Sequence, residues 1–134
     1  MRSTTRRIAA IGATSIIAAT TMGVVGVGPA AAKSKLEKPA PTTKIGREVA
    51  MAARWAARPK PIKVRQCESG NNYRINTGNG FYGAWQFAGG TWLGVGGGKY
   101  AARAHQAPKW AQDYMAWRLW KSRGWQPWEC AHMV

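Results

Sequence analysis

Acidic side chains are scarce in this chain of 134 residues: five Asp and Glu stand against twenty Lys and Arg. From residue 62 onward only Glu68, Asp113 and Glu129 are present. Any carboxylic acid that takes part in chemistry in that region is therefore one of these three. The formal net charge of +15 favours acidic partners, which outside a cell are wall polymers, anionic lipid headgroups and nucleic acid. Charge alone does not choose among them.

Long uncharged runs are also few, and the one at the amino terminus extends from Ile8 to Ala32. It follows a basic start and ends with small residues at Ala30 and Ala32, an order typical of a secretory signal peptide. We therefore predict a signal peptide over residues 1–32 and a protein that is secreted or associated with the cell wall. The alternative is a retained membrane anchor, because the run is long enough to span a bilayer. Its many Gly, Thr and Ala residues make it weakly hydrophobic and favour cleavage.

Cysteine and histidine are equally rare, with two of each. The spacing of Cys67, Cys130, His105 and His132 matches no zinc-binding pattern, so we predict no metal site and no cofactor. Outside the cytoplasm a lone pair of thiols usually forms a disulfide, and we expect Cys67 to pair with Cys130. Closing a loop of this length should stabilise the fold by about 4 kcal/mol on the chain-entropy model.

The length permits one domain rather than two, and we place it at residues 62–134. Residues 33–61 are rich in Lys, Pro and Ala, and they are predicted to form a basic linker. Within the linker, residues 46–58 place Val49 and Ala52 near one face, so a short amphipathic helix is expected there. This helix either packs against the domain, frays, or lies on an anionic surface.

The pattern from residue 62 onward predicts three helices and one turn, without internal repeats. The fold class is therefore α+β and mostly helical. The expected elements are a helix over residues 62–69 that ends at Gly70, a hairpin-like turn around Asn79 and Gly80, a short helix from Thr91 to the glycines at 96–98, and a helix from Pro108 to Gly124.

Glu68 is the most informative of the three acids. It follows a cysteine that is expected to be bridged, stands at a predicted helix end, and precedes a polar glycine-rich turn. Burial among tryptophans and aliphatic side chains would raise the pKa of its carboxyl toward values useful for a general acid. The plain alternative is an ordinary surface glutamate. Asp113, between Trp110 and Trp117 in a predicted helix, is expected to be solvated or paired with an arginine.

The segment from Cys67 to Phe87 reads CESGNNYRINTGNGFYGAWQF. It closely resembles the start of the resuscitation-promoting factor domain of actinobacteria, which has a lysozyme-like and transglycosylase-like fold. The resemblance extends through Tyr100 and a tryptophan-rich tail to Cys130. It implies a small lysozyme-like domain closed by one disulfide, with Glu68 as the catalytic acid. The positions that it assigns to the glycan cleft are Asn79, Gln86, Thr91 and Trp92.

Three departures from the family pattern bear on substrate contacts. Phe81 stands where the family commonly has tyrosine, which removes a hydroxyl that could bond to sugar. Trp85 replaces a smaller residue and either narrows the cleft or adds a surface on which a sugar stacks, so we include it among the predicted substrate-binding residues. The tail between Gly124 and Cys130 is about one residue shorter than usual.

These features predict a secreted enzyme, a lytic transglycosylase or a muramidase, that cuts the β-1,4 bond between N-acetylmuramic acid and N-acetylglucosamine. Glycosidases usually use two carboxylates. A single acid suffices if a hydroxyl or acetamido group of the sugar attacks the anomeric carbon, and Glu68 would then act as acid and base. Glu129 is the alternative second carboxylate, because a Cys67–Cys130 bridge would bring it within roughly 10 Å of Glu68.

Two rival functions stay open at this point. One is a non-catalytic peptidoglycan-binding module, and the other is a cationic protein that binds membranes or nucleic acid. The sequence contains no recognised nucleic-acid motif, so no specific nucleic acid is expected as a partner. The expected partners are peptidoglycan glycan strands and a wall endopeptidase, with the membrane contacted only through the signal segment. A monomer is the default for a domain of this size.

Overall fold

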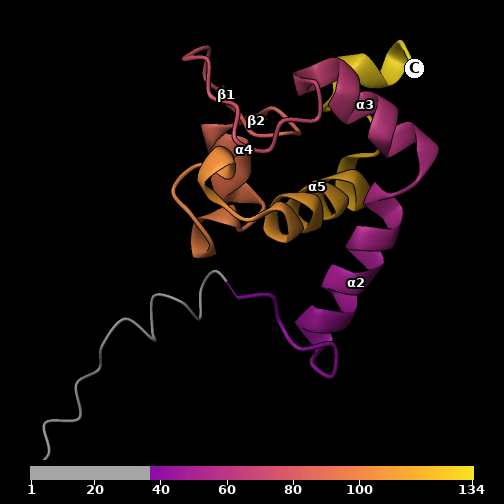
Figure 1. The fold of residues 1–134 in the computed structure, drawn as a ribbon, viewed down its shortest axis with the longest axis vertical. Coiled ribbons are helices and arrows are strands. Elements are labelled where there is room, and N and C mark those ends of the chain that lie inside the picture. Colours follow the sequence, from indigo (N-terminus) through magenta and orange to yellow (C-terminus); the bar gives the residue numbers. More distant parts are fainter. Residues whose placement is uncertain (1–36) are drawn as a thin grey trace, which may run out of the picture.

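The computed structural model describes residues 37–134, so the predicted signal peptide lies outside the described residues. The described part is mostly helical, with one small antiparallel sheet, which confirms the predicted α+β class (Figure 1). No helix within it is long and apolar enough to cross a membrane. The elements, in chain order, are α2 (Lys44–Ala56), α3 (Pro59–Ser69), β1 (Phe81–Tyr82), β2 (Phe87–Ala88), α4 (Gly89–Gly94), η1 (Gly97–Lys99), η2 (Ala104–Gln106), α5 (Lys109–Arg123) and η3 (Glu129–His132).

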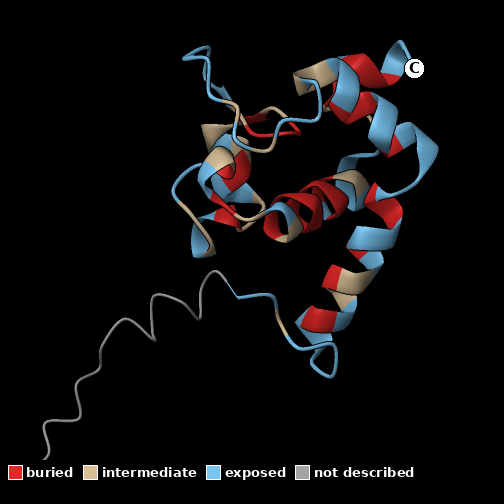
Figure 2. Ribbon diagram, in the orientation of Figure 1, coloured by how far each residue is buried: buried red, intermediate tan, exposed pale blue. Residues whose placement is uncertain are grey.

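Helix α5 is the centre of the fold. Every residue from Ala111 to Trp117 is buried, so the helix has no solvent-facing side over two turns (Figure 2). It begins after Pro108 and ends at Gly124, the two boundaries that the sequence predicts. The other elements are arranged around this helix, and the polar residues within it must find partners inside the protein.

Helix α2 packs along α5 and belongs to the folded unit. The side chain of Thr43 caps its first turn by accepting a hydrogen bond from the Gly46 amide. Its buried stripe includes Val49, Ala52 and Trp55, at the spacing of one helical face. The amphipathic helix expected within residues 46–58 is thus present, and its apolar face is covered by α5 rather than by a membrane. The compact fold starts well before residue 62.

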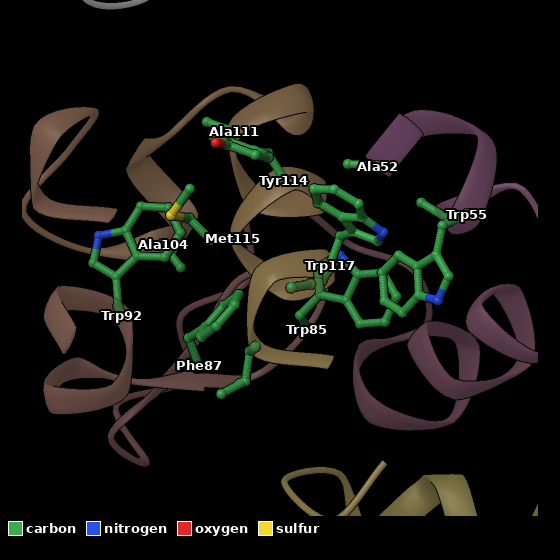
Figure 3. Packing of buried hydrophobic residues seen from close by; sticks show 14 of the residues in the cluster. Ala52, Trp55, Trp85, Phe87, Trp92, Ala104, Ala111, Tyr114, Met115 and Trp117 are labelled. Atoms are coloured by element: carbon green, nitrogen blue, oxygen red, sulfur yellow. The ribbon is translucent and has the colours of Figure 1, made fainter. Parts of the chain in front are cut away.

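Stacked tryptophans fill the space between α2 and the sheet. Trp55 stacks on Trp85 with ring centroids 5.1 Å apart and on Trp125 at 5.6 Å (Figure 3 shows the first pair). The guanidinium of Arg65 lies 4.8 Å from the centroid of the Trp85 ring, and it also donates to the carbonyl oxygen of Ala56. Large aromatic surfaces bury more area per residue than aliphatic ones, which suits a domain with a thin core.

Asp113 is a buried hub, and the expectation that it would be solvated or paired with an arginine is wrong. Only 2% of its surface is exposed. Its Oδ1 accepts hydrogen bonds from the Tyr73 hydroxyl (2.7 Å) and the Trp85 indole (2.9 Å), and its Oδ2 pairs with Lys109. Burial and the adjacent carboxylate raise the pKa of Tyr73 far above its ordinary value. A buried carboxylate with three donors is a structural anchor.

The glycine-rich segment forms a loop and then a tight hairpin. Asn76 and Tyr82 form an isolated antiparallel β-bridge, and the chain between them contains the predicted turn around Asn79 and Gly80. Strands β1 and β2 then pair antiparallel. Gly83, between the two strands, has φ +73° and lies against the buried side chain of Gln112. That side chain is fixed by hydrogen bonds to Tyr73, Ala84 and Ala107.

A pair of alanine substitutions tests this packing. Gly83→Ala should lower the free energy of unfolding by about 2–4 kcal/mol, because the new Cβ overlaps the fixed Gln112 amide and the backbone is left-handed. Gly80→Ala, at φ +86° with open space around it, should lower it by only about 1 kcal/mol. Urea unfolding of the oxidised proteins measures both. Equal losses would show that Gln112 yields and does not constrain the hairpin.

Candidate active site

A cavity of about 440 Å³ lies where the end of α3, the loop before β1 and the C-terminal segment meet. Figure 1 shows η3, in yellow, lying beside α3, a contact that the inter-residue distances also give. We call this cavity the cleft. Its lining residues are Glu68, Asn79, Phe81, Gln86, Pro127, Trp128 and Glu129.

The predicted disulfide is present and holds the two sides of the cleft together. Cys67, in the last turn of α3, is bonded to Cys130 of η3, and their Cα atoms are 5.8 Å apart. Each cysteine is next to a glutamate, so the bridge brings Glu68 and Glu129 to one cavity. No other cysteine is available to compete for either thiol.

Glu68 occupies a half-buried position at the end of α3. Its Oε1 accepts a hydrogen bond of 3.2 Å from the backbone N–H of Cys130. Burial raises the pKa of the Glu68 carboxyl above its ordinary value, and the negative charge of Glu129 raises it further. The N–H of Cys130 opposes this shift because it favours the ionised form. The net result is a carboxylic acid that keeps its proton to higher pH than an exposed glutamate does.

The helix end that carries Glu68 is fixed by its neighbours. Gly70 ends α3 with φ +63°, as the sequence predicts. The hydroxyl of Ser69 lies 2.8 Å from the carbonyl oxygen of Ala84 and donates to it, which ties α3 to the hairpin. The guanidinium of Arg65 donates to the side-chain oxygen of Asn71 in the following turn. These contacts hold the backbone on both sides of Glu68.

Two of the predicted glycan-binding residues lie in the cleft with Glu68. Asn79 accepts a hydrogen bond from the Phe81 amide, and its side-chain nitrogen has no partner within the described residues. Gln86 has a positive φ of 47° and donates to the carbonyl oxygen of Gly83, which turns it into the cleft wall. Both can therefore contact a molecule that occupies the cleft.

Thr91 lies beside the cleft rather than in it. It lines a smaller cavity of about 70 Å³ that shares Phe81, Gln86, Pro127 and Trp128 with the cleft lining. This neighbouring cavity extends the cleft past β2. Thr91 can reach a substrate only if the substrate continues in that direction.

Trp85 and Trp92 are core residues, and the expectation that they contact substrate is corrected. The exposed fraction of each is 0%. Trp85 is among the lining residues of the smaller cavity, but its indole donates to Asp113 and its ring packs on Trp55 and on the Arg65 guanidinium. The Trp92 indole donates to the carbonyl oxygen of Ala101. Gly97 packs so closely on the Trp92 ring that even a Cβ there would overlap it. Neither ring offers a face to a sugar.

Pro127 and Trp128 line the cleft, and the sequence analysis did not assign them to it. Trp128 is 3% exposed, and its indole donates to the carbonyl oxygen of Trp85 (3.0 Å), so its position is fixed. The only signal in the sequence was their closeness to Cys130. Phe81, which also lines the cleft, is 45% exposed and offers an apolar ring in place of a hydroxyl.

The cleft combines one acid of raised pKa, a second carboxylate, amide groups and aromatic walls. Such a site can protonate a leaving oxygen and hold a polar, ring-shaped ligand. Within residues 37–134 no group of three or more His, Cys, Asp or Glu side chains is placed to hold a metal ion. The chemistry that these residues can supply is proton transfer.

The electrostatic contact between the two glutamates can be measured. Replacing Glu129 with Gln removes the charge that raises the pKa of Glu68, so that pKa should fall toward the ordinary glutamate value, although burial keeps it above. Carboxyl ¹³C NMR titration of the two proteins gives the values directly. An unchanged Glu68 pKa in Glu129→Gln would mean that the carboxylates do not interact.

Comparison with known proteins adds to this geometry. The model of the transglycosylase-like domain family matches residues 52–131, which include α3, the hairpin, α5 and both cysteines. Resuscitation-promoting factor Rpf1 of Corynebacterium glutamicum is 44% identical over 66 residues, which are 49% of this chain and 34% of that protein. RpfE of Mycobacterium tuberculosis is 40% identical over 80 residues (60% and 41%), and RpfB of Mycolicibacterium smegmatis is 46% identical over 65 residues (48% and 18%).

The match covers less than half the length of each of these relatives. The family model nevertheless matches most of the described fold and every lining residue of the cleft. The family resemblance inferred from residues 67–87 is therefore confirmed. The chain belongs to the transglycosylase-like domain family, the one to which its similarity to resuscitation-promoting factors also points.

Proposed function

We propose that this chain is a secreted enzyme that cleaves the β-1,4 bond between N-acetylmuramic acid and N-acetylglucosamine in peptidoglycan, with Glu68 as general acid and base. The observation that carries the proposal is the Glu68 carboxyl itself, half-buried in the cleft, with its pKa raised by burial and by Glu129. Membership of the transglycosylase-like domain family supports the same substrate, and the similarity to resuscitation-promoting factors supports a role in cell-wall remodelling or resuscitation.

The proposed reaction needs one carboxyl group that changes roles. Protonated Glu68 gives its proton to the oxygen of the glycosidic bond while that bond breaks. The electron pair of the broken bond stays with the departing N-acetylglucosamine oxygen. The C6 hydroxyl oxygen of the muramic acid then bonds to the anomeric carbon. Ionised Glu68 takes the hydroxyl proton, so the enzyme returns to its starting state and no water is consumed. The product ends in a 1,6-anhydro sugar.

The raised pKa of Glu68 suits the first half of this cycle. A carboxyl whose pKa is raised keeps the proton that it must donate to higher pH than an ordinary exposed glutamate does. The hydrogen bond from the Cys130 N–H remains available to the carboxylate in the second half, when Glu68 is negatively charged. Burial and the charge of Glu129 thus favour the protonated form of Glu68, and the Cys130 N–H favours the ionised form.

Glu129 makes a hydrolytic variant of the reaction chemically possible. It is exposed on the cleft wall, where a carboxylate can activate a water molecule. Attack by that water would give a reducing end in place of the anhydro end. Glu129 is thus the residue on which the choice between a lytic transglycosylase and a muramidase depends in this proposal.

Asn79 and Gln86 are proposed to hold the acetamido and hydroxyl groups of the glycan next to Glu68. Thr91 is proposed to contact the next sugar in the smaller cavity. The basic surface would bring the protein onto the anionic wall. We also propose that residues 1–32 are a signal peptide. A partner endopeptidase would act on the peptide cross-links while this enzyme cuts the glycan.

Mass spectrometry of the muropeptides released from purified peptidoglycan tests the chemistry. The wild-type protein should release fragments with 1,6-anhydro ends, and Glu68→Gln should lower the release by about 10²- to 10⁴-fold, the usual worth of a positioned acid. Glu129→Gln is the matched control, because it makes the same chemical change in the same cleft. It should keep the anhydro products.

Other outcomes identify what is wrong with the proposal. Reducing ends that disappear in Glu129→Gln would identify a hydrolase with two carboxylates. Equal release by wild type and Glu68→Gln would remove Glu68 from the mechanism. No release by the oxidised wild-type protein, with retained binding to peptidoglycan, would identify a binding module.

A further inference from the structure

A second cavity, of about 320 Å³, opens between α2 and α5 and shares no lining residue with the cleft. We call it the arginine cavity. It contains two guanidinium groups and three indole rings, and no carboxylate is among its lining residues. These are Met51, Arg54, Trp55, Arg58, Trp117 and Trp120.

The positive charge of the arginine cavity is not neutralised by the protein. Arg54 and Arg58 are exposed, and neither forms an ion pair in the described part of the chain. The ammonium of Lys121 lies 3.6 Å from the centroid of the Trp117 ring and adds a third cation at the edge. Glu48, the acid on the same helix, accepts a hydrogen bond from the hydroxyl of Tyr114 at 2.5 Å and interacts electrostatically with Lys121, but it is not among the lining residues, so Arg54 and Arg58 have no carboxylate partner there. Like charges held together without a counterion favour the binding of an anion.

The basic surface continues beyond the arginine cavity. A neighbouring cavity of about 400 Å³ shares Met51 and Arg54 with it and adds the guanidinium of Arg47. Arg47 donates to the carbonyl oxygen of Thr42, which fixes it near the start of α2. A ligand longer than one unit therefore meets a further cation along the helix.

The indole rings of the arginine cavity are rigid. Trp55 packs on Trp120 with ring centroids 5.4 Å apart, and Trp120 packs on Trp125 at 6.2 Å. Trp120 is partly exposed, whereas Trp55 and Trp117 are buried and close the cavity floor. A fixed, partly exposed indole presents an apolar face on which the C–H side of a sugar ring can stack at little entropic cost.

We propose that the arginine cavity binds a sugar that carries an anionic group, a carboxylate or a phosphate. The guanidinium forks of Arg54 and Arg58 match the paired oxygens of either anion, and Trp120 supplies the stacking surface for the ring. The cavity has the size of a small-molecule site, which favours an acidic saccharide over a nucleic-acid strand. The site would attach the protein to acidic wall glycan while the cleft remains free.

The test uses the full chain with Glu68→Gln, so that binding is measured without turnover and the outcome does not depend on the proposed catalytic role. Digalacturonate supplies the carboxylate form of the ligand and glucose 6-phosphate the phosphate form. Chitotetraose is the neutral sugar, and inorganic phosphate is the anion without a sugar. Binding is followed by the indole N–H signals in ¹⁵N NMR spectra and by titration calorimetry at fixed salt.

The acidic sugars should shift the indole signals of Trp117 and Trp120 and bind more tightly than chitotetraose or phosphate. Whichever of the two binds more tightly identifies the anion. Arg54→Lys and Arg58→Lys keep the charge but lose the planar fork, and each should weaken binding by about tenfold. Arg74→Lys is the matched control, since Arg74 is exposed and outside the cavity, and it should leave binding unchanged.

Three results would overturn the proposal. The first is an equal shift of the Trp117 and Trp120 indole signals by chitotetraose at the same concentration, which would remove the need for an anion at this cavity. The second is equal weakening by Arg74→Lys, which would show that the loss of a guanidinium outside the cavity has the same effect. The third is tighter binding of inorganic phosphate or of a DNA oligonucleotide than of both acidic sugars. Trp120→Leu gives an independent check, because it should weaken the acidic sugars and leave inorganic phosphate unaffected.

Discussion

The bond between Cys67 and Cys130 joins the last turn of α3 to the C-terminal helix η3, and these two segments carry the two glutamates of the cleft. Without this covalent link the C-terminal turn would be held mainly by Trp128, whose indole donates to the carbonyl oxygen of Trp85. The link also places the Cys130 N–H where it can donate to Glu68. One bond thus determines the shape of the cleft, the charge near its acid and one hydrogen bond to that acid.

The remaining rigidity comes from a core made of aromatic rings. Trp128 packs on Trp85, Trp85 stacks on Trp55, and Trp55 reaches the arginine cavity, so one continuous stack separates the two cavities. Asp113 holds this stack in position by accepting a hydrogen bond from the Trp85 indole. A domain with so little aliphatic core gains most of its burial from these rings. Both sites are therefore built on the same rigid support.

The sequence predicted those features that depend on residues close together in the chain. Pro108 and Gly124 determine the ends of α5, and a conspicuous motif around Glu68 indicated the acid. Contacts between distant segments were not predictable in this way. A charged residue such as Asp113 in a helix usually faces solvent. Its burial depends on a hydrogen bond from Tyr73, which is forty residues away in the chain. Trp85, next to the glycine-rich loop, suggested a surface for sugar, whereas the packing of α2, which lies outside the motif, buries it.

The central claim is that a single carboxyl of raised pKa carries the reaction, and the pH dependence of muropeptide release tests it most directly. The proton-donating form of Glu68 is lost as pH rises through its pKa, so the rate should fall on the alkaline side. The account predicts that the midpoint of this fall coincides with the Glu68 pKa measured by NMR, above the ordinary glutamate value. A rate that is constant across that pKa would contradict it.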